Sequence, residues 1–410
     1  MEIKLPAGWT SCLLKDAVSS RKGKKPATVI NYEKKGYDPY LLIDELEGKP
    51  ARAFTNDPKV PRANKKDVLL VWDGSIGKCA SGMSGAVGST MAVLSPKKGL
   101  NTKFLEYFIR RSKNNILETS TGTGLQHINK NFLKTVNIPL PPNEKEQELI
   151  ADKLDILIAK VKDAQSRLDK IPTILGRFRQ SVLAAAFSGE LTKEWRKKNN
   201  IDSEWQEVSL DELLDDLKYG TAKKCCKEKK KHLVLRIPNV VNEYIDLIDL
   251  KYTDLDKKEY ESLKLEMGDI LLIRSNGSVS LVGRTALVTE KEEGMAYAGY
   301  LIRLRVKKDL IIPEFLQYQF QSYAMRLQIE LPARSTSGVN NINSHEVKNL
   351  KIALSSIEEQ KEVIGRLNNL FAFLEQNKKE YDKAKSYADK LEQSILAKAF
   401  RGELVLQKGK

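Results

Sequence analysis

The sequence contains a long internal repeat, and this feature limits the possible folds more than any other. Residues 184–191 (AAAFSGEL) recur as residues 397–404 (AKAFRGEL), with six of eight positions identical. Further matches keep the same order upstream, through Gln180-Ser181 and Gln393-Ser394 back to Trp9 and Trp205. A repeat of about 200 residues is much longer than a solenoid unit. We therefore interpret it as duplication of a whole domain together with its connector.

Each copy ends in a segment whose apolar residues are alternately three and four positions apart. This 3.5-residue period predicts a narrow helical seam that packs against another long helix, and the obvious partner is the other copy. The first seam comprises Leu154, Leu157, Val161, Ala164, Leu168, Ile171, Leu175, Phe178, Val182 and Ala185. The second comprises Leu367, Leu370, Leu374, Asn377, Tyr381, Ala384, Ala388, Leu391 and Ile395. Pro172 predicts a kink or a break near Ile171 in the first helix alone.

The linker between the copies resembles the two chain ends joined together. The stretch from Phe187 to Trp205 corresponds to the tail after Phe400 plus the head before Trp9. This correspondence predicts antiparallel helices, a pseudo-twofold relation between the copies, and neighbouring N- and C-termini. The arrangement would be quasi-circular.

The segments between the helices are predicted to be mixed α/β domains. Short β-rich runs and helix-like segments alternate with Gly, Pro and Asn punctuation. The fold class is therefore α/β (mixed α+β), with two similar globular domains separated by two long antiparallel helices that form a coiled coil. We expect a first domain at 1–142, a helical spacer and linker at 143–204, a second domain at 205–355, and a second helical spacer and tail at 356–410. Strands are expected at 68–72, 270–274 and 300–306, and short helices at 101–111 and 312–321.

Positive charge makes a polyanion a plausible partner. Sixty-nine Lys and Arg against 54 Asp and Glu give a net charge of +15, and clusters lie at 21–25 and 223–231, at corresponding places in the two copies. Such clusters fit an electrostatic footprint on a nucleic-acid duplex, although solvated loops are the alternative. Loops rich in hydroxyls, Gly and amides at 119–130 and 334–343 suit contact with phosphates and base edges, or are ordinary capped turns.

Duplication also separates scaffold positions from candidate reading positions. If each domain reads a different short sequence, the reading residues differ between the copies, so they are expected mainly in 19–66 with 74–91 and in 218–262 with 275–300. The DNA-binding candidates from these stretches, the basic clusters and the loops are Lys22, Lys24, Lys25, Ser75, Lys78, Thr123, Gln126, Lys130, Lys223, Lys224, Asn276, Ser278, Arg284, Arg334 and Asn340.

Catalytic and metal motifs are incomplete. Four Cys and three His are too few and too scattered for a disulfide framework or a metal cage. Residues 74–79 (GSIGKC) lack the spacing and the Ser/Thr of a phosphate loop. Residues 37–40 (YDPY) lack one Pro of a base-gripping methyltransferase motif, and no glycine fingerprint for the methyl donor precedes them. We expect no enzyme activity and no bound metal. No signal peptide or membrane span is indicated, so a cytoplasmic location is expected.

These residues together resemble a known family, the specificity subunits of type I restriction-modification systems. Residues 138–142 (IPLPP) followed by Glu146-Gln147 look like the family's helix entry, and 186–191 (AFSGEL) and 399–404 (AFRGEL) look like its helix ends. The second helix entry departs from the pattern, with 352–356 (IALSS) in place of the prolines. The resemblance covers essentially the whole chain.

The resemblance implies a non-catalytic DNA-recognition subunit with two target-recognition domains. Each domain would read one half of a bipartite site in double-stranded DNA, and the helices would act as a spacing ruler. The partners would be two modification (methyltransferase) subunits and two restriction (motor-nuclease) subunits, which would hold S-adenosylmethionine, ATP and Mg²⁺. Two alternatives remain at this point: a stand-alone adenine DNA methyltransferase, and a coiled-coil scaffold with no DNA role.

Overall fold

The computed structural model describes residues 5–122, 126–202, 204–333 and 338–404. It divides into two compact units, which are described separately: the first contains Met1–Asp169 and Asp382–Lys410, and the second contains Lys170–Tyr381. Both units contain helices and strands, so the predicted mixed α/β class is confirmed. Each unit combines chain from both copies of the repeat, because the long helical segments start in one unit and end in the other.

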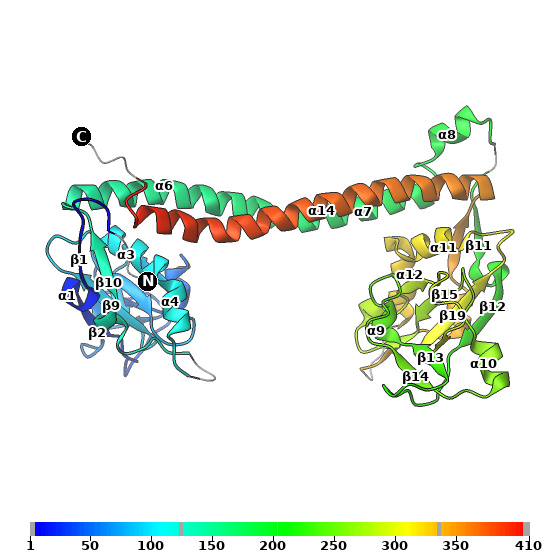
Figure 1. The fold of residues 1–410 in the computed structure, drawn as a ribbon, viewed down its shortest axis with the longest axis horizontal. Helices are drawn as coiled ribbons and strands as arrows, with labels where there is room; N and C mark the ends of the chain where they lie inside the picture. Colours follow the sequence, from blue (N-terminus) through cyan, green and yellow to red (C-terminus); the bar gives the residue numbers. More distant parts are fainter. Residues whose placement is uncertain (1–4, 123–125, 203, 334–337, 405–410) are drawn as a thin grey trace. The chain divides into compact units, whose positions relative to one another are not determined.

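In the first unit, a four-stranded sheet of order β2-β9-β6-β7 forms the centre, and Figure 1 labels its strands β2 and β9. A small sheet of four short strands, of order β4-β3-β8-β5, packs on one of its faces. Val68 and Leu70 of β6 join a core with the helix α3, whereas Leu69 and Val71 join the small sheet. An unbroken apolar run is what a strand covered on both faces requires. The elements are β1 Thr10–Leu13, α1 Leu14–Ala17, β2 Val18–Lys22, β3 Asp38–Leu41, α2 Ile43–Leu46, β4 Phe54–Thr55, β5 Arg62–Ala63, β6 Val68–Val71, β7 Cys79–Ser81, β8 Gly85–Val87, β9 Met91–Pro96, α3 Thr102–Arg111, α4 Lys113–Glu118, α5 Phe132–Thr135, β10 Asn137–Leu140 and α6 Glu144–Leu168.

The second unit repeats this plan. Its central sheet has the order β12-β19-β15-β17, and Ile270 and Leu272 of β15 face a helix-covered core while Leu271 and Ile273 face a small sheet of order β14-β13-β18. The internal duplication is therefore confirmed at the level of the fold. The elements are α7 Ile171–Phe187, α8 Lys193–Lys198, β11 Gln206–Ser209, η1 Leu210–Leu213, β12 Leu214–Tyr219, β13 His232–Leu235, α9 Ile237–Val240, β14 Lys251–Thr253, α10 Lys257–Leu263, β15 Ile270–Ile273, β16 Ser275–Asn276, η2 Val279–Leu281, β17 Thr285–Leu287, β18 Ala296–Tyr297, β19 Leu301–Val306, α11 Pro313–Phe320, α12 Tyr323–Ala333, β20 Asn340–Asn341, α13 Ser344–Lys348, β21 Lys351–Leu354 and α14 Ile357–Ala399.

The helix entries are built alike, although only the first is rich in proline. Strand β10 pairs with β1, and β21 pairs with β11 in the same antiparallel manner. The buried amide of Gln147 accepts from Asn101 N (2.8 Å) and donates to Gly99 O (2.9 Å). Gln360 accepts from Ile312 N (2.8 Å) and donates to Leu310 O (3.0 Å) in the second unit. The glutamine of each Glu-Gln pair thus ties its long helix to the start of α3 or α11.

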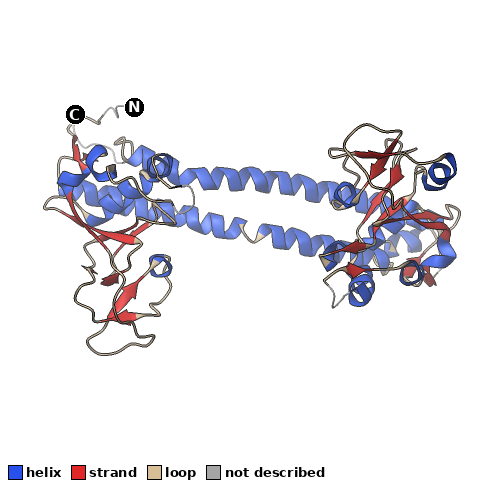
Figure 2. Cartoon of the chain, turned by 90° about the horizontal axis from the view of Figure 1, so that it is seen from below, coloured by secondary structure: helices blue, strands red, loops and turns tan. Residues whose placement is uncertain are grey.

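The predicted interruption by proline is confirmed. The first helical segment divides into α6 and α7 at Asp169-Lys170, and Pro172 lies in the first turn of α7, where its missing N–H costs no intrahelical bond. Figure 2 draws this break in one of the long helices. By contrast, α14 continues without a break for 43 residues.

Within the first unit, α6 and the last part of α14 run antiparallel. Lys153 Nζ donates to Leu404 O (2.6 Å), Gln165 Nε2 donates to Ala388 O (3.3 Å), and Lys385 pairs with Asp169 (2.7 Å). Residue numbers rise along one helix as they fall along its partner. Within the second unit, α7 and the first part of α14 share one core, to which they contribute Val182, Leu183, Leu367 and Phe371 among others.

The seam is less uniform than a strict heptad pattern. Of the predicted positions, Leu154, Val161, Leu367 and Leu374 are buried, and Leu157, Leu168, Leu175, Leu370, Tyr381 and Leu391 are half-buried. Three expected seam residues, Ala164, Phe178 and Ala384, lie at the surface instead.

The exposure of Phe178, at 41%, corrects the sequence-based expectation. Its neighbour Arg179 faces α14 instead. The Arg179 guanidinium stacks over the Phe371 ring at 4.3 Å and donates to Gln321 Oε1 at 2.5 Å. α7 therefore packs through Arg179, Val182, Leu183 and Ala186, against α14 and the second domain together.

Each long helical segment ends by inserting a phenylalanine into the core of the unit that it reaches. Phe400 packs on Phe104 with ring centroids 4.9 Å apart, and Phe187 packs on Phe315 at 5.3 Å. The following glycines, Gly189 and Gly402, have φ values of +77° and +72°, which favour glycine and stop the helix.

The described chain ends meet in the first unit. A Cβ on Gly402 would lie 2.6 Å from Pro6 Cγ, so the tail passes directly against the head of the chain. Neighbouring ends are what the quasi-circular expectation requires.

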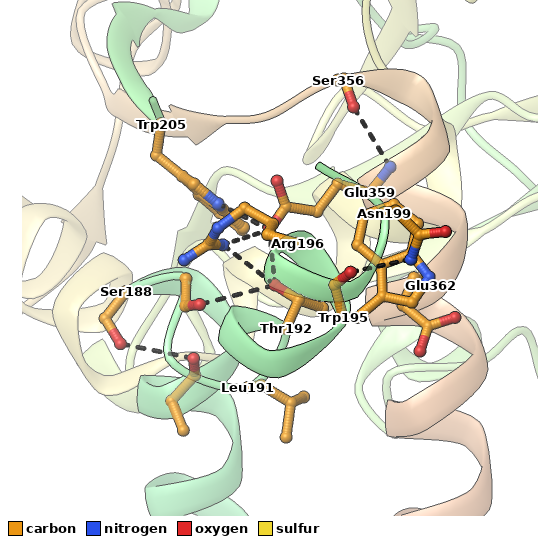
Figure 3. A network of polar contacts seen from close by, with 12 residues as sticks. Ser188, Leu191, Thr192, Trp195, Arg196, Asn199, Trp205, Ser356, Glu359 and Glu362 are labelled. Atoms are coloured by element: carbon orange, nitrogen blue, oxygen red, sulfur yellow. Dashed lines mark hydrogen bonds and ion pairs between the residues drawn. The ribbon is translucent and has the colours of Figure 1, made fainter. Parts of the chain in front are cut away.

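A buried carboxylate fastens the linker to the start of α14 in the second unit (Figure 3). The Glu359 side chain is fully buried and accepts from Thr192 Oγ1 (2.5 Å), from Trp205 Nε1 (2.9 Å) and from the Arg196 guanidinium. The partners come from both ends of the linker, so this one residue holds the linker in place.

Candidate nucleic-acid interface

The end of the central strand meets the hydroxyl- and amide-rich loop in the first unit. Ile128 N donates to Trp72 O (2.9 Å), and Gly74 N donates to Gln126 O (2.9 Å). Ile128 is buried and anchors the loop, while Gln126 is exposed beside it. The loop is therefore held against the strand exit, where its polar side chains face solvent.

Three polar residues converge at this strand exit. Asp73 Oδ1 lies 2.7 Å from His127 Nδ1, and Asp73 Oδ2 accepts from Lys22 Nζ at 2.8 Å. Burial disfavours the charged form of Asp73, but the hydrogen bonds from Lys22 and His127 outweigh it and hold the pKa of this carboxyl below its ordinary value. Asp73 is thus an ionised acceptor that fixes two partly exposed side chains.

The second unit builds the same junction with other side chains. Ile342 N donates to Arg274 O (2.8 Å), and β16 pairs with β20 so that Ser275 lies opposite Asn341. Arg274 Nε donates to Asn341 Oδ1 (3.3 Å), and its guanidinium lies 4.7 Å from the centre of the Tyr219 ring. The arrangement presents a fixed planar cation where the first unit has one carboxylate, Asp73, bonded to Lys22 and His127.

The basic clusters lie close to these junctions. Gly23 and Gly220 directly follow β2 and β12, at positions where an added Cβ would lie 2.1 and 2.3 Å from backbone oxygens of Gly88 and Tyr297. Only glycine fits such a close approach. In the second unit the chain then lines a cavity of about 580 Å³, whose basic lining residues are Lys223, Lys224, Arg236, Lys251 and Arg274.

The predicted DNA-binding residues that are exposed are Lys22, Lys24, Lys25, Ser75, Lys78, Gln126, Lys130, Lys223, Lys224 and Ser278. Lys223 pairs with Glu259 (2.7 Å), and Lys78 pairs with Glu47. Asn276 is half-buried, and its Oδ1 accepts from Ser278 N (2.9 Å). Thr123 and Arg334 lie outside the described residues.

Two predicted residues, Arg284 and Asn340, make hydrogen bonds to backbone oxygens of their own unit. Arg284 donates to Ser280 O (3.1 Å) and Val241 O (2.9 Å), and Asn340 Nδ2 donates to Gly277 O (3.0 Å). These bonds hold the backbone of the segment after β15.

Sequence reasoning did not select Asp73, His127, Tyr219, Arg274 and Asn341 as site residues. A signal was present, because Arg274 comes one residue after the aligned run at 269–273 and Asp73 comes two residues after the run at 67–71. Their partners could be found only from the fold, since Lys22 and His127 are 51 and 54 residues away from Asp73.

The described residues provide no cluster of His, Cys, Asp or Glu able to hold a metal ion. In residues 74–79, which lack the features of a phosphate loop, Lys78 is paired with Glu47, and burial raises the pKa of the Cys79 thiol to about 12. Over the described part of the chain, no helix is long and apolar enough to cross a membrane.

A duplicated recognition fold is also what comparison with known proteins finds. Residues 6–172 and 202–386 each match the family described as type I restriction modification DNA specificity domain. The chain therefore belongs to the family of type I restriction-modification specificity subunits, whose role is DNA sequence recognition.

Curated relatives span nearly the full chain. It is 31% identical to the EcoKI specificity subunit of Escherichia coli K12 and 30% identical to the StySPI specificity subunit of Salmonella potsdam, with 98% of this chain and 91% of each relative covered. The MjaVIII specificity subunit of Methanocaldococcus jannaschii is 26% identical over 97% of this chain and 94% of the relative.

Solved structures share the fold. A chain from a study of assembly and conformational transition of the type I restriction-modification system has a TM-score of 0.70 at 19% identity, covering 98% of this chain and 99% of that chain. The HsdS subunit of Thermoanaerobacter tengcongensis has a TM-score of 0.62 at 18% identity, with the same coverage.

Proposed function

We propose that this chain is a non-catalytic subunit whose two domains each read one half of a bipartite DNA site. The observation that carries the proposal is the repeated junction between the central strand and the polar loop. The backbone bonds are the same in both units, from Ile128 to Trp72 and from Ile342 to Arg274, while the exposed side chains differ. Matched scaffolds with unlike side chains suit two unlike half-sites.

The paired long helices serve as the spacing ruler in this proposal. A coiled-coil pair is stiff, and the major groove faces the same side of a duplex about every 34 Å. Two domains attached to such helices can therefore read half-sites about one turn apart and leave the bases between them unread.

The exposed surfaces of α6, α7 and α14 are the proposed docking platform for the partner subunits. We infer two modification subunits and two motor-nuclease subunits per full complex. S-adenosylmethionine, ATP and Mg²⁺ belong to those partners in this proposal, and this chain supplies recognition.

Co-expression with the matching modification subunit, followed by genome-wide mapping of methylated adenines, tests the proposal. An interrupted motif with two different halves and a fixed gap is expected. A continuous or palindromic motif, or methylation that does not depend on this chain, would refute it.

Binding by the same complex to its mapped site is expected to weaken steeply with salt, because Lys and Arg contacts release counterions from the duplex. Titrations at several salt concentrations measure the slope. An affinity that does not change between about 50 and 200 mM salt would contradict an interface built from the basic clusters.

A further inference from the structure

Matched positions at the two junctions can be assigned from the backbone alone. Lys22 and Tyr219 end β2 and β12, the strands that flank β9 and β19. Asp73 lies opposite His127 in an isolated bridge, and Ser275 lies opposite Asn341 in the same way. His127 and Asn341 therefore occupy equivalent places, each just before a buried isoleucine.

The hydrogen-bonding edge of His127 is fixed by its surroundings. Asp73 is ionised and can only accept, so His127 donates the hydrogen on its Nδ1 to Asp73 Oδ1. In the neutral ring, Nε2 then carries the lone pair. The described residues provide no hydrogen bond to Nε2, and the side chain is 46% exposed. An exposed acceptor matches the amino group that adenine or cytosine presents in the major groove.

The equivalent edge in the second unit has the opposite character. Asn341 Oδ1 already accepts from Arg274, so the amide presents its NH₂ group. Arg274 is held over the Tyr219 ring and presents its remaining guanidinium donors. Neighbouring donors in a fixed plane match the O6 and N7 acceptors of guanine.

We propose that His127 in the first unit, and Asn341 with Arg274 in the second, are specificity-determining residues. His127 accepts a hydrogen bond from a base amino group in one half-site, and the Arg274–Asn341 pair donates to a guanine in the other. This inference rests on the proposed function and names the residues that make the two half-sites differ.

The test uses the complex of the whole chain with its modification subunits and a panel of duplexes. Each duplex changes one base pair of the site mapped with the unaltered chain. His127→Ala is expected to lower discrimination at one base pair of one half-site by about 2- to 12-fold, the worth of a single hydrogen bond, and Asn341→Ala is expected to lower discrimination in the other half-site only. His127→Gln, which keeps an acceptor, is expected to retain more discrimination than His127→Ala.

Lys24→Ala is the matched comparison, because an exposed lysine beside the junction is expected to weaken every duplex alike through lost phosphate attraction. The inference is overturned if His127→Ala leaves all discrimination ratios unchanged or weakens all duplexes uniformly. Full discrimination at the other half-site shows that the variant is folded. Failure of the unaltered complex to show two half-sites would instead count against the proposed function.

Discussion

At the scale of single residues, the second unit depends on Glu359, a fully buried carboxylate with three donors. A buried charge is tolerated only when it is paired and hydrogen-bonded. Thr192, Arg196 and Trp205 meet that requirement at one oxygen, Oε1, whereas the buried Oε2 has no hydrogen-bond partner among the described residues. If the linker moved away, the Glu359 carboxylate would be left buried without its donors or would have to become exposed to solvent.

Glu359→Gln is expected to destabilise the second unit by about 2–4 kcal/mol, because it removes the ion pair and leaves Arg196 without its carboxylate. The urea midpoint of the full chain measures the change. Glu194→Gln is the control, since Glu194 is 81% exposed in its pair with Lys197 and is expected to change stability by less than about 1 kcal/mol. Equal midpoints for the two variants would contradict the role given to Glu359.

Cys79 is expected to resist alkylation in the folded protein. Burial raises the pKa of its thiol to about 12, so the reactive thiolate is scarce up to about pH 9, well below that pKa. Mass spectrometry after brief iodoacetamide treatment at pH 8 measures the label, with the partly exposed Cys226 as the internal comparison. Rapid labelling of Cys79 without unfolding would show that the core around it opens.

At the scale of elements, the sequence predicted the strands, helices and breaks that depend on neighbouring residues alone. The β-rich run at 68–72, the helix at 101–111 and the break caused by Pro172 follow from residue type and spacing. The predicted seam is wrong at Phe178, because Arg179 takes the packed side of α7, where it contacts the Phe371 ring and donates to Gln321 Oε1. The junction of Lys22, Asp73 and His127 could not be predicted, because it joins segments brought together only by the sheet.

Inserting one heptad beside Gln165 in α6 and another beside Asp389 in α14 lengthens a paired region at facing positions. Seven residues add about 10 Å of helix and keep the seam in phase. The gap in the mapped site is expected to grow by up to about three base pairs, with both half-sites unchanged. Methylation mapping that shows altered half-sites and the original gap would refute the ruler.

At the scale of the whole molecule, each half of the chain completes the unit of the other half. Phe400 closes the core around Phe104, Phe187 closes the core around Phe315, and Gly402 rests against Pro6. The place where the tail meets the head of the chain therefore resembles the linker around α8 in the second unit.

A circularly permuted chain tests this equivalence. Joining residue 410 to residue 1 and opening the chain after Asn199 keeps Arg196 on Glu359 and leaves both cores intact. The permuted chain is expected to fold and to bind DNA with its partners as the natural chain does. Several permuted chains opened near this point that all fail to fold would contradict the quasi-circular arrangement.

Exchange of residues 9–142 for the corresponding domain of another specificity subunit tests the central claim most directly. The exchanged chain is co-expressed with the same modification subunit, and methylated adenines are mapped across the genome. The account predicts that one half of the bipartite motif changes to that of the donor, while the other half and the gap remain. A motif that changes in both halves, or in neither, would contradict it.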